Sequence, residues 1–326
     1  MNTRPASARR LLDSAPWIRK PFSRDNRLIV VLVVFSLVAG AVRPTFLTWT
    51  NLALILASAA VLGVLALGEF VVIITGAIDI SIGVICGISA LTLSYTLGVG
   101  FPPVLAILVA VIAAMASGAI NGALVGWARI PSVVVTLATT SLFLWVMVTL
   151  TGGASSSAGH EHLGWLTSRG RVGVPLSVAV FFGTAILLSV LASRTQFGRQ
   201  LYEVGANEAA ARVAGVDVRR VRILTFVLAG ALAGVAGVLL GSQLAYVTAL
   251  TGGGLVFLGI GAVVLGGTNL FGGSGLVRGV VTGVLLLYAI YNAMVLLRVP
   301  SAWQDAVAGA LILVAVIFDT LGRRAK

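Results

Sequence analysis

Long apolar stretches follow one another along most of the chain, separated by short segments in which charged residues, glycine or proline gather. A helix that crosses a membrane needs about 20 mostly apolar residues. By that measure the pattern predicts ten membrane spans, of which the third and the eighth are interrupted by glycine. We place them at residues 28–47, 52–75, 79–97, 103–128, 131–151, 175–193, 222–249, 254–272, 275–297 and 301–320.

The composition agrees with this pattern. Of the 326 residues 59% are hydrophobic and only 10% are charged, whereas soluble domains carry about 25% charged residues. The chain is therefore expected to be an integral membrane protein. A single cysteine, Cys86, excludes a framework of disulfides and is expected to be a small buried residue.

The basic residues indicate which side of the membrane each loop faces. Residues 1–27 form a basic segment before the first span. The apolar run that follows resembles a signal peptide with a small-residue end at 39–41, but the many later spans favour an uncleaved first span. With the N-terminus inside, all but four of the 22 basic residues are cytoplasmic. This bias predicts cytoplasmic termini, with a multi-span domain over 28–320 and a basic tail over 321–326.

The longest charged interruption lies between residues 194 and 222 and holds six basic residues and three carboxylates. Asn207 is suited to cap a short helix, Glu208 favours the positive end of its dipole, and Gly215 suits a left-handed exit. We expect a short helix here that docks onto a partner, with Ala209 and Ala210 inside it. The alternative is an ordinary positively charged cytoplasmic loop.

Two stretches resemble each other at a distance of about five spans. Residues 119–132 end in Arg129-Ile-Pro-Ser, and residues 289–301 end in Arg298-Val-Pro-Ser. Five spans is an odd number, so a second copy would lie upside down in the membrane. Inverted repeats are common in transporters, where the path of the solute runs near the middle of the membrane between the two halves.

Catalytic and nucleotide-binding chemistry is not supported by the sequence. His160 and His162 flank Glu161 in a loop rich in glycine and serine and are expected to be solvated side chains rather than metal ligands. A phosphate-binding Walker A loop needs lysine after glycine, and neither Lys20 nor Lys326 follows glycine. We expect no catalytic residue, metal or cofactor, and an ATP-driven function would need a separate ATPase. The net charge of +12 is assigned to membrane orientation, and no nucleic acid partner is expected.

Polar residues within or beside the spans are the candidates for the solute path. Glu69 and Asp305 lie in apolar sequence, while Asp79 and Asp319 lie near span ends. Ionisable groups at membrane depth point to function, although a structural pairing is the main alternative. Further candidates could hydrogen-bond a hydroxylated solute, or could hold helices together: Asn121, Thr136, Gln243, Asn269 and Asn292.

Several motifs together resemble the ribose/xylose-type permeases of ABC importers over nearly the whole chain. They are the Gly-Ala-Ile-Asp-Ile-Ser-Ile-Gly run at 76–83, the Asn-Gly segment at 118–125, the charged segment from 197 to 215, the glycine-rich run at 263–275, and Trp303-Gln304. Ala77 and Asn269 depart conservatively from the usual pattern. Four residues separate Ala210 from Gly215, one more than in maltose-type permeases, which argues against that fold.

The resemblance implies an all-α membrane fold of the cobalamin-type (type II) importer permeases, with ten spans in each subunit. It also implies a second permease subunit in a homodimer or heterodimer, two cytoplasmic ATPases, and a periplasmic or lipid-anchored sugar-binding protein. The segment from Asn207 to Gly215 would contact the ATPases. The expected function is import of a monosaccharide or similar polyol.

A rival hypothesis is a proton-coupled secondary transporter in which Glu69 or Asp305 carries the proton. It would need neither an ATPase nor a binding protein. A signalling receptor is disfavoured, because the chain has no recognisable soluble output domain.

Overall fold

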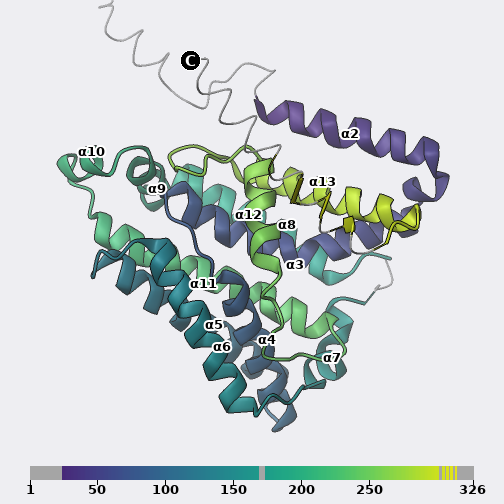
Figure 1. Cartoon of the computed structure of the whole chain (residues 1–326), viewed down its shortest axis with the longest axis horizontal. Helices are drawn as coiled ribbons and strands as arrows, with labels where there is room; N and C mark the ends of the chain where they lie inside the picture. Colours follow the sequence, from purple (N-terminus) through teal and green to yellow (C-terminus); the bar gives the residue numbers. More distant parts are fainter. Residues whose placement is uncertain are drawn as a thin grey trace, which may run out of the picture.

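The computed structural model describes residues 24–168 and 173–300, together with scattered positions from 303 to 313. Within these residues the regular structure is helical, apart from one β-bridge between Ser156 and Val247. Figure 1 shows α9 and α10 at one end of the long helices and α7 toward the other. The long helices are α2 (Arg24–Val42), α3 (Trp49–Ile74), α4 (Ile82–Gly98), α5 (Pro103–Gly126), α6 (Ser132–Thr151), α8 (Leu176–Arg194), α11 (Val218–Gln243) and α13 (Val277–Leu296). The short ones are η1 (Pro44–Leu47), α7 (Ala158–Leu163), η2 (Gly164–Leu166), α9 (Gln196–Ala206), α10 (Glu208–Val213) and α12 (Leu255–Leu265).

The prediction of an all-helical membrane protein is confirmed. Among the described residues six helices are long and apolar enough to cross a membrane, namely α3, α5, α6, α8, α11 and α13. The apolar part of α2 and the helices α4 and α12 are shorter. Each of the first nine predicted spans contains one of these helices. The tenth, with Asp305 and Asp319, lies largely outside the described residues, so a total of ten spans stays a prediction.

Two of the predicted spans had wrong boundaries. The helix α11 begins at Val218 and ends at Gln243, whereas the predicted span was 222–249. Asp217 accepts a hydrogen bond from the backbone N–H of Arg220 at 3.1 Å, and this cap starts the helix before its basic residues. The helix α12 begins at Leu255, next to the predicted start, but it has only 11 residues because a loop replaces the last part of the predicted span 254–272.

The helices α4 and α12 are both too short to cross a membrane by themselves. At 1.5 Å per residue, the 17 residues of α4 and the 11 of α12 extend less than the roughly 30 Å of a bilayer core. The loop before α12 packs its backbone against the start of α4. A Cβ atom on Gly83 would lie 2.6 Å from the Gly252 oxygen, and one on Gly252 would lie 2.4 Å from the Gly83 oxygen. The backbone of this loop is thus in close contact with that of α4, although the loop itself is only partly buried.

The helices α3 and α11 form the centre of the molecule. α11 packs against α5, α4 and α3, while α3 also packs against α13, α12 and α8. α11 and α5 meet at glycines: a Cβ atom on Gly118 would lie 2.3 Å from the Phe226 oxygen, and one on Gly230 would lie 2.6 Å from the Ala114 oxygen. Small residues of this kind let helix backbones approach closely in a membrane, where burial of apolar surface gives little drive for association.

The two Arg-(Ile/Val)-Pro-Ser stretches adopt the same turn. Arg129 and Arg298 both have a φ of 58°, and among the described residues they are the non-glycine residues with positive φ. Such a conformation is costly for an arginine. The helix before each turn, α5 or α13, packs on α11 or α3 respectively. The sequence resemblance thus extends to backbone geometry and to packing.

Candidate functional site

Four buried side chains from three parts of the fold form a polar cluster in the interior. Glu69 lies on α3, Asp79 and Ser81 lie in the connection between α3 and α4, and Asn121 lies on α5; all four are fully buried. We call these four residues the polar cluster. It contains three of the predicted path residues, which are 10 to 52 positions apart in the sequence.

Hydrogen bonds link the cluster in a chain. The backbone N–H of Asp79 donates to Glu69 Oε1 at 3.3 Å. Asp79 Oδ1 accepts from the Ser81 backbone N–H at 2.9 Å and from Ser81 Oγ at 2.5 Å. Asn121 Nδ2 in turn donates to Ser81 Oγ at 2.7 Å. α3, α5 and the start of α4 are thereby tied together through Asp79 and Ser81.

The helix α6 also contacts the connection between α3 and α4. The backbone N–H of Ile78 donates to Ser132 Oγ at 3.2 Å, and the buried Thr136 donates from Oγ1 to the Ile78 oxygen at 3.5 Å. Thr136 therefore lies beside the cluster, where it contacts the backbone rather than the acidic groups, and its role on the solute path stays a prediction. A change in the position of α6 would move Ile78, and with it the neighbouring Asp79.

The electrostatics of the cluster are unusual. Three buried oxygen atoms have no hydrogen-bond partner among the described residues, namely Glu69 Oε2, Asp79 Oδ2 and Asn121 Oδ1. In the described part of the chain no basic group forms an ion pair with either carboxyl group. The described residues also contain no group of three histidines, cysteines or acidic residues that could hold a metal. The cluster is thus rich in free acceptors, which suits hydrogen-bond donors such as hydroxyl groups.

The other predicted path residues do not join the cluster. Gln243 is exposed at the last position of α11. Asn269 lies in the turn between α12 and α13, where its Oδ1 accepts from the Phe271 N–H at 2.8 Å. Asn292 pairs with Asn51, each amide donating to the other at 2.8 and 2.9 Å. These three residues lie outside the polar cluster, and their role on the solute path stays a prediction.

The Asn51–Asn292 pair gives a prediction about stability. Asn292→Leu should destabilise the chain by about 0.6–1.7 kcal/mol, the range of polar contacts between membrane helices, because Asn51 loses its partner. Unfolding in mixed micelles would measure this. The double variant Asn51→Leu/Asn292→Leu should cost less than the sum of the two single variants; simple additivity would contradict the pairing.

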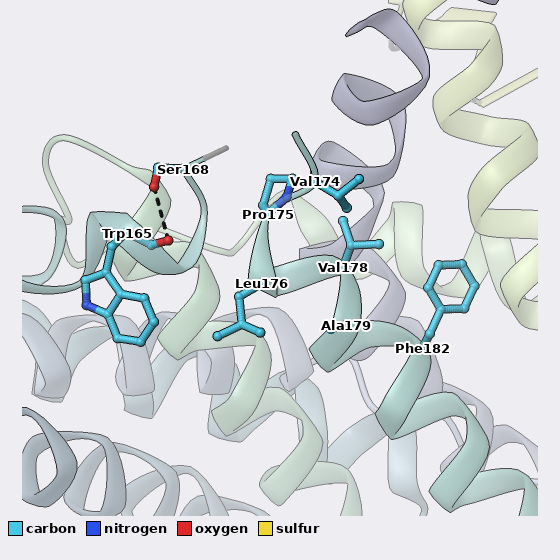
Figure 2. Close-up of a pocket in the computed structure, with 8 residues that line it drawn as sticks. All are labelled: Trp165, Ser168, Val174, Pro175, Leu176, Val178, Ala179 and Phe182. Carbon is cyan, nitrogen blue, oxygen red and sulfur yellow. Dashed lines mark hydrogen bonds between the residues drawn. The ribbon is translucent and has the colours of Figure 1, made fainter. Parts of the chain in front are cut away.

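A separate hollow lies near α7. A groove of about 510 Å³ is lined by residues of η2, of the loop after it and of the start of α8, and Figure 2 shows these side chains, including the hydrogen bond from Ser168 Oγ to the Trp165 oxygen. Its walls are mainly apolar. His160 and Glu161 in the preceding α7 are exposed, as expected, and the Nδ1 atom of His160 lies 3.0 Å from the Ser242 oxygen.

The segment 194–222 contains two helices that the sequence predicted only in part. α9 is capped by Thr195, whose side chain accepts from the Gly198 N–H. α10 is capped by Asn207, whose Oδ1 accepts from the Ala210 N–H at 3.0 Å, and the chain leaves α10 through Gly215 at a φ of 85°. The predicted cap, short helix and left-handed exit are thus confirmed, whereas the 11-residue α9 was not foreseen.

Glu208 ties α10 to α11. Its Oε1 accepts from Arg212 Nη2 at 2.6 Å, and its Oε2 accepts from Arg222 Nη2 at 2.5 Å. The hydrogen bond from Arg212, joined by that from Arg222, lowers the pKa of Glu208 below its ordinary value. Folding stability from this contact is therefore present above the ordinary pKa of glutamate and is lost as the pH falls through the lowered one. The pair is partly exposed, so its contribution is small.

One face of α10 is open and apolar. Ala209 and Ala210 are exposed, and Val213 is 91% exposed, whereas Ala211 is buried against the rest of the chain. An apolar side chain in such a charged segment exposes surface that a partner can cover. Val213 was not among the predicted contact residues; its exposure depends on which face α10 turns outward.

Backbones from three parts of the chain meet where α9 ends. A Cβ atom on Gly205 would lie 1.9 Å from the Ile74 oxygen and 2.6 Å from the Gly273 nitrogen. The N–H of Gly273 donates to the Ile74 oxygen at 2.9 Å, and a Cβ atom on Gly272 would lie 2.6 Å from the Gly76 nitrogen. We call Ile74, Gly76, Gly205, Gly272 and Gly273 the glycine junction.

Tyr202 fastens α9 to the same place. Its hydroxyl group donates to the Gly275 oxygen at 3.0 Å. Burial raises the pKa of Tyr202 to about 12, so the phenol stays a neutral donor. The glycine junction connects the segment 194–222 to the end of α3 at Ile74, five residues before Asp79 of the polar cluster. Sequence reasoning noticed the glycine-rich runs but did not predict that Gly205 meets them.

Comparison of the sequence with known protein families finds a match. The family model described as branched-chain amino acid transport system / permease component matches residues 51–316. The chain belongs to this permease family. The match contains the polar cluster, the glycine junction and the segment 194–222.

Relatives within the family are permeases of import systems. The chain is 34% identical over 312 residues to the autoinducer 2 import system permease protein LsrC of Yersinia enterocolitica, covering 91% of this chain and 84% of the relative. It is 34% identical over 307 residues to LsrC of Salmonella typhimurium and 35% identical over 312 residues to LsrC of Yersinia pseudotuberculosis, in each case covering 91% of this chain and 86% of the relative. No solved structure matches the chain. The resemblance to ribose-type ABC sugar importer permeases is confirmed, and with it a multi-pass membrane location.

Proposed function

We propose that this chain is the permease subunit of an ATP-driven importer that carries a monosaccharide or a similar small hydroxylated solute into a bacterium. ATP is hydrolysed by separate ATPase subunits, a binding protein delivers the solute, and a second permease subunit completes the path. The observation that carries the proposal is the exposed apolar face of α10, joined through α9 and the glycine junction to the end of α3. The LsrC relatives support import of a small solute, since they are permeases of autoinducer 2 import systems.

The proposed orientation places both termini, the basic segment 1–27, the tail 321–326 and the segment 194–222 in the cytoplasm. The distribution of basic residues supports it. We further propose ten spans in a type II arrangement, with an inverted repeat that relates α3, α4 and α5 to α11, α12 and α13. The matching turns at Arg129 and Arg298 and the matching packing support the repeat.

The proposed path passes the polar cluster. Hydroxyl groups of the solute would donate to the free acceptors of Glu69, Asp79 and Asn121 once the cluster opens. Thr136 would act through Ile78 by setting the position of the 75–81 connection. Gln243, Asn269 and Asn292 have no part in this proposal.

Reconstitution tests the proposed function. Proteoliposomes that contain the permease, its ATPase and its binding protein should take up the solute only when ATP is supplied on the ATPase side. Uptake driven by a proton gradient, without ATPase or binding protein, would instead support the rival secondary transporter. A screen of the binding protein against sugars by thermal shift would identify the solute first.

Charge reversal tests the docking role of α10. Glu208→Arg should abolish co-purification of the ATPase while membrane insertion is kept, because a third positive charge beside Arg212 and Arg222 detaches α10 from α11. Normal recovery of the ATPase would contradict docking here.

The swap Glu208→Arg/Arg222→Glu separates two explanations. It rebuilds the ion pair between α10 and α11 with reversed charges. If Glu208 acts only by placing α10, the double variant should regain at least part of the ATPase co-purification. If Glu208 itself contacts the ATPase, the double variant should lose co-purification as the single variant does.

A further inference from the structure

Two carboxyl groups share the closed interior of the polar cluster, and no basic group among the described residues forms an ion pair with them. Glu69 and Asp79 are fully buried and linked by the hydrogen bond from the Asp79 N–H to Glu69 Oε1 at 3.3 Å. Asp79 is the charged neighbour that acts on Glu69. Two unpaired negative charges enclosed together in this way are strongly disfavoured, so at least one group must be neutralised.

The helices packed against α3 do not supply the missing positive charge. α4 and α12 contain no charged residue, and the charges of α8, α11 and α13 lie close to the ends nearest α9 and α10. Arg199 and Glu203 lie on α9, in the aqueous segment. The remaining titratable side chains on these helices are a cysteine and tyrosines, which supply no positive charge in either protonation state: Cys86, Tyr95, Tyr202, Tyr288 and Tyr291.

The hydrogen bonds decide which group carries the charge. Asp79 Oδ1 accepts two hydrogen bonds from Ser81, at 2.9 and 2.5 Å, and such bonds favour the ionised form. Glu69 accepts only one, and it is longer. Asp79 is therefore the better anion and Glu69 the better acid.

A second, independent observation is that the cluster has oxygen acceptors without donors. Asn121 is fully buried, and its Nδ2 is engaged with Ser81 Oγ at 2.7 Å, yet its Oδ1 has no donor. Glu69 Oε2 is likewise without a partner. Acceptors outnumber donors in the cluster. A protonated carboxyl group adds one donor, whereas a cluster with both carboxyl groups ionised keeps the excess of acceptors.

We propose that the polar cluster is a proton-binding site in which Glu69 holds one proton while the cluster is closed. The proton comes from water when the cluster closes, bonds to a carboxylate oxygen of Glu69, and returns to water on the same side when the cluster opens. No proton crosses the membrane, and the site supplies no driving force. The site is thus distinct from the carrier of the rival secondary transporter.

Infrared spectroscopy of the full chain in lipid tests this directly. At neutral pH the wild type should show the carbonyl stretch of a buried protonated carboxylic acid, and Glu69→Gln should lack it. Asp217→Asn, which changes an exposed carboxyl group on α11's cap, is the matched control and should keep the band. A spectrum in which wild type and Glu69→Gln do not differ at this band would overturn the proposal.

The pH dependence of stability is a second measurement. In the unfolded chain Glu69 is ionised above a pH of about 4.3, so unfolding releases the bound proton and stability falls as the pH rises through neutrality. Glu69→Gln resembles the protonated acid and should fold. Its folding constant should change less with pH than that of the wild type, by up to about a factor of ten per pH unit. An unchanged slope would contradict the proposal. Neither measurement needs ATPase or solute, so both remain informative if the proposed transport function fails.

Discussion

Replacement of Gly205 by alanine is expected to abolish ATP-driven uptake. The new methyl group would lie 1.9 Å from the Ile74 oxygen, and both the contacted atom and the Gly273 nitrogen at 2.6 Å are backbone atoms that no side-chain rotation can move aside. Overpacking of this kind costs about 1–3 kcal/mol. We expect α9 to shift away from α3, and uptake in reconstituted importer to fall by at least about tenfold.

The matched control for this variant is Gly183→Ala on α8. Apart from the backbone of its own helix, no described residue has an atom within 4 Å of a Cβ atom built at Gly183, and the residue is also helical. It should leave uptake unchanged, or stabilise the helix slightly. If Gly205→Ala transported like Gly183→Ala, the glycine junction could not be the place through which α9 and α10 act on α3. Retained membrane insertion and retained ATPase binding would separate loss of transmission from loss of folding.

Removal of the Asp79 carboxyl group should have the second large effect. Asp79→Ala leaves the Ser81 N–H and Oγ without their acceptor in a fully buried site. Each such unsatisfied group costs about 1–3 kcal/mol. We therefore expect a clearly lower midpoint of thermal unfolding in lipid micelles, together with loss of uptake, since the 75–81 connection also loses its anchor to α5 through Ser81 and Asn121.

Two controls show whether the loss of stability in Asp79→Ala comes from the burial of its hydrogen-bond partners. Asp79→Asn keeps an oxygen acceptor of similar size and should lose less stability than Asp79→Ala. Asp217→Ala removes a carboxyl group that also accepts from a backbone N–H, at 3.1 Å, but on an exposed cap. It should cost only about 1 kcal/mol. Equal losses for Asp79→Ala and Asp217→Ala would show that the polar cluster is not under the constraint inferred from its hydrogen bonds.

The sequence was sufficient for features that depend on neighbouring residues or on overall polarity. Apolar runs of sufficient length determine membrane helices, so the class of protein and nine helix-containing spans could be predicted. Capping is also local: Asn207 and Gly215 act on residues within a few positions, and α10 was found where they indicated. The repeated Arg-(Ile/Val)-Pro-Ser turn could be read in the same way, because its backbone conformation depends on the residues next to it.

Only the tertiary structure decided which distant residues meet. Asn121 and Asn292 are both polar residues in apolar helices, yet packing brings Asn121 to Ser81 and Asp79, while Asn292 meets Asn51. Gly205 looks like any glycine in a charged loop until α9 places it against Ile74 and Gly273. Glu208 could have pointed toward a partner, but the crossing of α10 and α11 turns it to Arg222. In each case the deciding contact joins residues from separate helices, and its energy depends on how these helices cross, which the local pattern of hydrophobic and polar residues does not specify.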